Sequence, residues 1–122
     1  MNPLAIALGI LLGLIFVAAG LTKILGKREA LIPRMGWIAD FSPVMVRLIG
    51  VAETLGGIAL LVLGPLGWRG LSLVAAICLA VTMILAIIVH IRRQERRETI
   101  PALVLLIMLV ILIGLEASGL VA

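Results

Sequence analysis

Residues Leu71–Ile91 read LSLVAAICLAVTMILAIIVHI and contain no Asp, Glu, Lys or Arg. An α-helix needs a run of about 20 apolar residues to cross the hydrocarbon core of a bilayer. This run does not alternate between apolar and polar residues, as a strand of a membrane barrel would. It also lacks the polar face of a helix on a soluble protein. The stretch therefore predicts a transmembrane helix, and it decides the class of the fold.

Three further runs are similarly long and largely apolar, and they span residues 3–25, 44–63 and 100–121. Because lipid offers no hydrogen-bond partner to the backbone, each run should be an α-helix. We therefore predict an all-α, polytopic membrane protein whose residues 1–122 form one domain. That domain is a bundle of four transmembrane helices, at about residues 3–25, 44–63, 71–91 and 100–121.

The composition agrees with a membrane protein. Of the 122 residues, 64% are hydrophobic and 13% are charged. A soluble domain of this length could not bury so much apolar surface, because small domains leave much of their surface exposed. The net charge is +4, but the charges lie in short blocks without an aromatic-studded basic face, so we expect no nucleic-acid partner. The single cysteine, Cys78, allows no internal disulfide, and we expect it to be a small packing residue.

Helix start and stop signals agree with these limits. Gly26 is a good stop for the first helix. Ser42 followed by Pro43 is a typical N-cap and first helical residue. Thr99 is the expected cap of the last helix, with Pro101 in its first turn, where a missing N–H costs little.

The connections between the helices differ in character. The first, residues 26–42, is too long and too apolar for a plain loop, so we expect a short interfacial helix broken by Pro33 and Gly36. The third, residues 92–98, should be a solvated turn that touches anionic lipid. These two connections hold seven basic residues, whereas the second holds Arg69. The positive-inside rule then places connections one and three in the cytoplasm and both termini outside.

Glu53 is the most informative residue, because it lies near the middle of a predicted membrane helix. An ionisable side chain there costs about 2.5–3.5 kcal/mol on insertion scales, so it needs a partner, a proton or water. Gly50, Gly56 and Gly57 lie one turn before and after it, and they allow another helix to pack closely. The sequence leaves open whether this carboxyl fixes helix packing or carries a function.

Lys23 is the candidate partner of Glu53. One face of the first helix, defined by spacings of three and four residues, carries Gly9, Gly13, Phe16, Gly20 and Lys23. The glycines on this face predict a close helix contact. Alternatively, Lys23 extends its ammonium group to the nearby interface.

Other polar residues lie toward the helix ends. His90 can exchange protons near neutral pH, but no second histidine or cysteine lies at ligand spacing, so we predict no metal site. Arg47 is six residues from Glu53 and does not share its face, so we expect it to pair with Asp40 or with acids of the third connection. Glu116 is expected at the far interface.

Lys23, Arg47, Glu53 and His90 all belong to the same half of the predicted bundle. Together they form a candidate intramembrane polar pocket. Such a pocket suits a proton, a quinone headgroup or a lipid headgroup.

Two segments carry a resemblance to a known family. Phe16–Lys23 reads FVAAGLTK, and Arg47–Gly57 reads RLIGVAETLGG. With His90 and Pro101, they make the whole chain resemble the DoxX and DoxX-like four-helix membrane proteins, and the G-x-x-E of the second helix is the most specific part. The family takes its name from a subunit of an archaeal thiosulfate:quinone oxidoreductase, so the resemblance implies a link to quinones or membrane redox chemistry. Some relatives act as assembly partners or chaperones.

Three functions therefore stay open. We favour an accessory or assembly subunit of a membrane complex, partnered by the bilayer and by other membrane subunits or a second copy of the chain. The alternatives are a small proton-coupled transporter that uses Glu53, and a quinone-reactive oxidoreductase. A quinone is the cofactor that the resemblance implies, but the residues show no cofactor motif and we do not expect the chain to catalyse alone. We expect its location to be a prokaryotic cytoplasmic membrane.

Overall fold

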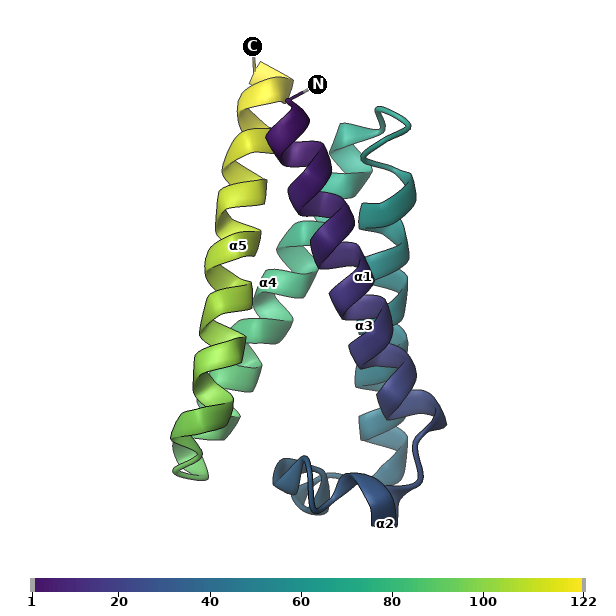
Figure 1. The fold of residues 1–122 in the computed structure, drawn as a ribbon, viewed down its shortest axis with the longest axis vertical. Coiled ribbons are helices and arrows are strands. Elements are labelled where there is room, and N and C mark those ends of the chain that lie inside the picture. Colours follow the sequence, from purple (N-terminus) through teal and green to yellow (C-terminus); the bar gives the residue numbers. More distant parts are fainter. Residues whose placement is uncertain (1, 122) are drawn as a thin grey trace.

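The computed structural model describes the backbone of residues 2–121 and the side chains of residues 2–118. Its four long helices are α1 (Pro3–Leu25), α3 (Pro43–Val62), α4 (Arg69–Arg92) and α5 (Arg96–Val121). All four run from one end of the bundle to the other, and α1 and α4 are tilted against the long axis (Figure 1). Each contains a segment long and apolar enough to cross a membrane. The predicted all-α, four-helix membrane bundle is confirmed. The outermost positions of the predicted domain, residues 1 and 122, lie outside the described residues.

The helix starts follow from local sequence. The side chain of Ser42 accepts a hydrogen bond from the Met45 N–H at 3.1 Å, and Pro43 occupies the first helical position of α3. Gly26 ends α1, as predicted. The turn between α3 and α4 contains Gly67 with a φ of 85°, a backbone conformation that favours glycine.

The predicted start of the last helix is wrong. α5 begins at Arg96 rather than at Ile100, and Thr99 lies inside its first turn, where its hydroxyl donates to the Glu95 carbonyl at 2.7 Å. The prediction counted only apolar residues. Arg and Glu are good helix formers, so the helix continues past the apolar run into the polar segment.

Glycines set the close contact of α1 with α3. A Cβ atom at Gly20 would lie 2.5 Å from the Gly50 carbonyl oxygen, and one at Gly57 would lie 2.7 Å from that of Gly13. Such distances leave no room for a side chain, so the two backbones touch at these positions. Gly56 packs on Leu79 of α4 instead. At Gly9 the nearest atom would be 3.9 Å away, an ordinary contact, so this glycine is not needed for the crossing.

The first connection forms α2 (Arg28–Leu31) and the 3-10 helix η1 (Gly36–Asp40), which lie across one end of the bundle (Figure 1). The expected short helix is thus present. We call this end, where the α1–α3 and α4–α5 connections lie, the charged end. Leu31, Ile38 and Val46 form a small second core there.

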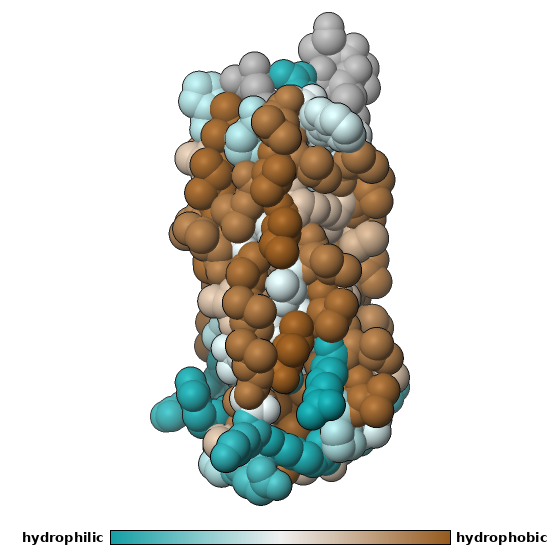
Figure 2. Space-filling view, turned by 90° about the vertical axis from the view of Figure 1, so that its right-hand side faces the viewer, coloured by the Kyte–Doolittle hydropathy of each residue, from teal (hydrophilic) through white to brown (hydrophobic). Residues whose placement is uncertain are grey.

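The outer surface of the bundle is apolar along its length, and hydrophilic side chains gather chiefly at the charged end (Figure 2). Leu55 and Leu85, for example, are 62% and 58% exposed. Lipid is the solvent that such a surface suits. Cys78 also lies on this surface, so the expectation that it is a small packing residue is wrong within this chain.

Candidate functional site

Lys23 and Glu53 form an ion pair between α1 and α3. The Lys23 Nζ lies 2.9 Å from Glu53 Oε1 and 3.2 Å from Oε2. The side chains are only 11% and 3% exposed. Both carboxylate oxygens therefore have the same cation as partner, and the pairing expected from the sequence is present.

Small residues make room for this pair. A Cβ atom at Gly50 would lie 3.0 Å from the Lys23 Cβ, so the lysine stem passes directly over this glycine. The Thr54 hydroxyl donates to the Gly50 carbonyl at 2.7 Å, which satisfies a polar group that would otherwise face the apolar interior. The pair is thus built into the glycine contact of the two helices.

An aromatic residue of η1, Trp37, also lies near Lys23. The Lys23 Nζ lies 5.9 Å from the centroid of the Trp37 ring, within the range of a cation–π contact. Trp37 in turn makes an edge-to-face contact with Phe41, with ring centroids 5.7 Å apart. Lys23 therefore links both the α3 carboxylate and the segment that crosses the charged end.

His90 belongs to a different cluster. Its Nδ1 lies 3.0 Å from Glu95 Oε1, in the turn between α4 and α5. Gln94 adopts a φ of 58°, and this turn brings the Glu95 N–H to 2.8 Å from the His90 carbonyl. Among residues 2–118, no hydrogen bond or ion pair joins His90 to Lys23 or Glu53.

The α4–α5 turn is docked on η1, rather than being only solvated as the sequence suggested. Arg93 forms an ion pair with Asp40, and its Nε lies 3.1 Å from Glu95 Oε1. The hydrogen bond and the charge of Asp40 raise the pKa of Arg93 above its usual range. The expected pairing of Arg47 with Asp40 or with the acids of this turn is wrong, because Arg93 lies nearer to both Asp40 and Glu95.

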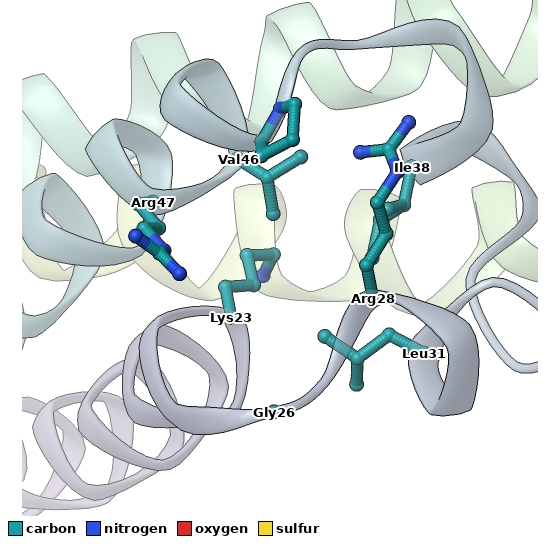
Figure 3. A pocket seen from close by; sticks show the side chains of 8 residues that line it. Lys23, Gly26, Arg28, Leu31, Ile38, Val46 and Arg47 are labelled. Carbon is teal, nitrogen blue, oxygen red and sulfur yellow. The ribbon is translucent and has the colours of Figure 1, made fainter.

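Arg47 is exposed near the start of α3, and it lines a cavity with Lys23 and Arg28 (Figure 3). The cavity has a volume of about 50 Å³. Small-molecule pockets measure roughly 300–1,000 Å³, so this one has room for a few waters or a single small group. The sequence did not single out Arg28, because nothing in its pattern showed that α2 folds back toward α3.

Glu116, which the sequence places near the far interface, is buried against Ser72 of α4. It is 3% exposed, and its Oε1 accepts a hydrogen bond of 2.7 Å from the Ser72 hydroxyl, itself 1% exposed. Its Oε2 has no hydrogen-bond partner among the described residues. Matching depths of Ser72 and Glu116 in the antiparallel helices α4 and α5 could have revealed this pair.

The buried polar groups thus form separate clusters at opposite ends. Lys23–Glu53 and His90–Glu95 lie toward the charged end, and Ser72–Glu116 lies toward the other. Between them the bundle is filled by an apolar core that includes Leu12, Phe16, Ala76, Leu79, Leu109 and Leu112. The candidate pocket of four residues is therefore divided: Lys23 contacts Glu53 and lines a cavity with Arg47, whereas His90 contacts Glu95.

A protein-family model described as the DoxX-like family matches residues 7–112. The match includes Lys23, Glu53 and His90, and it ends before Glu116. Comparisons with curated proteins and with solved structures give no match.

Proposed function

The chain belongs to the DoxX-like family, and from this we propose that it is an accessory or assembly subunit of a membrane complex. One observation carries the proposal: the buried carboxylate of Glu53, at the centre of α3, is paired with a cation of the same chain. Both oxygens of Glu53 are held by Lys23 at 2.9 and 3.2 Å. The Glu53 carboxylate is thus engaged by Lys23 rather than presented to a substrate.

The outer surface supports the same proposal. Ile77 and Val81 on α4 are 45% and 51% exposed, and Cys78 lies beside them. In a membrane, helices associate by close packing of such surfaces rather than by hydrophobic burial, since lipid is equally apolar. A partner would therefore be another membrane subunit or a second copy of this chain.

Cys78 offers a direct test, because it is the single cysteine of the chain. The tagged protein, at native expression level, would be treated in membranes with a membrane-permeable, thiol-reactive photo-cross-linker, illuminated, and then purified under denaturing conditions. We expect discrete cross-linked partners that disappear in the matched Cys78→Ser control. The same partners should co-purify in mild detergent without cross-linking. A protein that stays alone in both experiments would contradict the proposal.

Proton-coupled transport is the second candidate, and the burial of an acid inside a predicted span favours it. Glu53 is 3% exposed. A carboxyl in this setting can take up and release a proton if the Lys23 contact opens. The test is proton uptake by proteoliposomes under an applied potential, with Glu53→Gln against the exposed control Glu98→Gln. Uptake that Glu53→Gln leaves unchanged would remove this candidate.

A quinone-linked role is the third candidate, and the family resemblance is its only support. The cavity beside Lys23, at about 50 Å³, is small for a quinone ring. Solvent extraction of the purified protein, followed by chromatography, tests it. Stoichiometric quinone would favour this role, and its absence from freshly purified protein would count against it.

For orientation we propose that the charged end faces the cytoplasm of a prokaryotic cell, because residues 26–42 and 92–98 hold seven basic residues. The test places single cysteines in a Cys78→Ser background. Leu66→Cys, between α3 and α4, should react with an impermeant maleimide in intact cells. Glu98→Cys, at the charged end, should react only after lysis. The reverse pattern would invert the orientation.

A further inference from the structure

Three cationic side chains from three different elements wall the cavity at the charged end. They are Lys23 of α1, Arg28 of α2 and Arg47 of α3, and Figure 3 shows Lys23 between the two arginines. The remaining walls are apolar or backbone, with Gly26, Leu31, Ile38, Pro43 and Val46. No acidic residue lines this cavity.

The positive charge here exceeds what the nearby acids neutralise. Lys23 is paired with Glu53. Among the described residues, neither Arg28 nor Arg47 takes part in a salt bridge or side-chain hydrogen bond. Two acids of this end, Asp40 and Glu95, are already bound by Arg93.

One atom of the cavity lacks its partner. The Nη1 of Arg28 is buried and has no hydrogen-bond partner among the described residues. Buried donors of charged groups nearly always have a hydrogen-bond partner, since burying a donor without one costs free energy. An acceptor that occupies the cavity would satisfy this nitrogen.

We propose that this cavity binds a phosphate group, carried either by an anionic phospholipid or by free phosphate. A guanidinium presents a planar set of donors that matches phosphate oxygens, and Arg28 and Arg47 supply two of them. The Lys23 ammonium adds charge, and Pro43 marks the N-terminus of α3, whose dipole favours an anion. The cavity volume of about 50 Å³ fits one small group rather than a larger ligand.

The surroundings of the cavity give a phospholipid access to it. Leu25 and Val44 adjoin the lining residues Gly26 and Pro43 in the chain, and they are 75% and 66% exposed. Acyl chains could therefore lie on these side chains while the phosphate enters the cavity. This site is independent of the proposed subunit role, and either can fail without the other.

The test measures lipid binding to the purified protein in detergent by native mass spectrometry. Phosphatidylglycerol and phosphatidylcholine with identical acyl chains are titrated separately, and inorganic phosphate is added at constant ionic strength. The pocket variant is Arg28→Gln with Arg47→Gln. The matched control is Arg96→Gln with Arg97→Gln, which removes the same charge from exposed positions at the same end.

We expect phosphatidylglycerol to bind more tightly than phosphatidylcholine, and the pocket variant to lose about tenfold in affinity while the control loses no more than about twofold. Competition by inorganic phosphate would identify free phosphate as a ligand, and its absence would identify the lipid. The charge-conserving Arg28→Lys, Arg47→Lys variant should keep part of the binding. Melting curves of all variants verify the fold.

Two results would overturn the site. One is equal loss in the pocket and control variants, which would mean that surface charge alone attracts the lipid. The other is unchanged binding in a pocket variant whose melting curve matches the parent protein.

Discussion

Lys23 Nζ lies 2.9 Å from Glu53 Oε1, and this contact joins the last turn of α1 to the middle of α3. It forms beside Gly20 and Gly50, where the two backbones touch. The glycines bring the helices close enough for the lysine to reach the carboxylate. The ion pair in turn neutralises the carboxylate, so that α3 can remain in the membrane. Packing and charge thus depend on each other at this crossing.

Removing one member of the pair should destabilise the bundle. Lys23→Met leaves the buried Glu53 without a counter-charge, and Glu53→Leu leaves the buried Lys23 without one. Each single change should cost about 3 kcal/mol of unfolding free energy, whereas the double variant should recover most of that loss. Unfolding in mixed micelles with increasing SDS, followed by far-UV circular dichroism, measures these free energies. Additive losses in the double variant would refute a direct pairing.

The glycine contact makes a second prediction. In Gly20→Ala the added Cβ would lie 2.5 Å from the Gly50 carbonyl oxygen and would also meet the Thr54 side chain. The helices must then separate, and we expect a loss of about 2 kcal/mol. Gly114→Ala is the matched control, because nothing lies within 4 Å of the added atom. It should be neutral or stabilising by about 0.5 kcal/mol. The same unfolding titration checks both, and equal effects would contradict the packing.

The buried Glu116 is tested through its partner. Ser72→Ala leaves Glu116 without its 2.7 Å hydrogen bond in a nearly solvent-free position. We expect a loss of about 1–2 kcal/mol. Glu116→Gln can still accept from the Ser72 hydroxyl, so it should change the unfolding free energy by no more than about 0.5 kcal/mol. A large loss in Glu116→Gln with none in Ser72→Ala would show that the carboxyl charge, and not this bond, matters.

The ion pair of Asp40 with Arg93 should hold η1 against the α4–α5 turn. Asp40→Asn should therefore increase hydrogen exchange in residues 26–42, whereas Glu29→Gln, the same charge change on α2, should not. Asp40 raises the pKa of Arg93. The stability that this ion pair contributes is therefore fully present below the usual arginine pKa, and it is lost only as the pH rises through the raised value. Any change of protection near neutral pH must then come from other groups. Equal hydrogen exchange in both variants would contradict this role of the Asp40–Arg93 ion pair.

Much of the fold was predictable because it depends on local properties. The apolar runs, Ser42 and Gly26 act within a few residues, and lipid forces each run to be helical. The start of α5 was missed because polar helix formers such as Arg96 carry no apolar signal. The exposure of Cys78 was missed because every face of α4 is apolar, so hydropathy could not distinguish lipid from the interior.

The candidate site was only partly predictable. Spacing placed Lys23 on the glycine face of the first helix, and the cost of an unpaired Glu53 supplied the reason to pair them. Contacts between distant segments were not accessible in this way. Asp40 meets Arg93 rather than Arg47 because of how η1 lies across the bundle end, and that arrangement is tertiary.

We propose that the Lys23–Glu53 pair holds α1 and α3 together in a subunit that binds other membrane proteins. The most direct test is quantitative co-purification of partners with the Lys23→Met, Glu53→Leu double variant. We expect the same partners in parental amounts, because an apolar pair can replace a structural ion pair. A double variant that melts like the parent protein but has lost its partners would contradict it, since the charges themselves would then be needed for function.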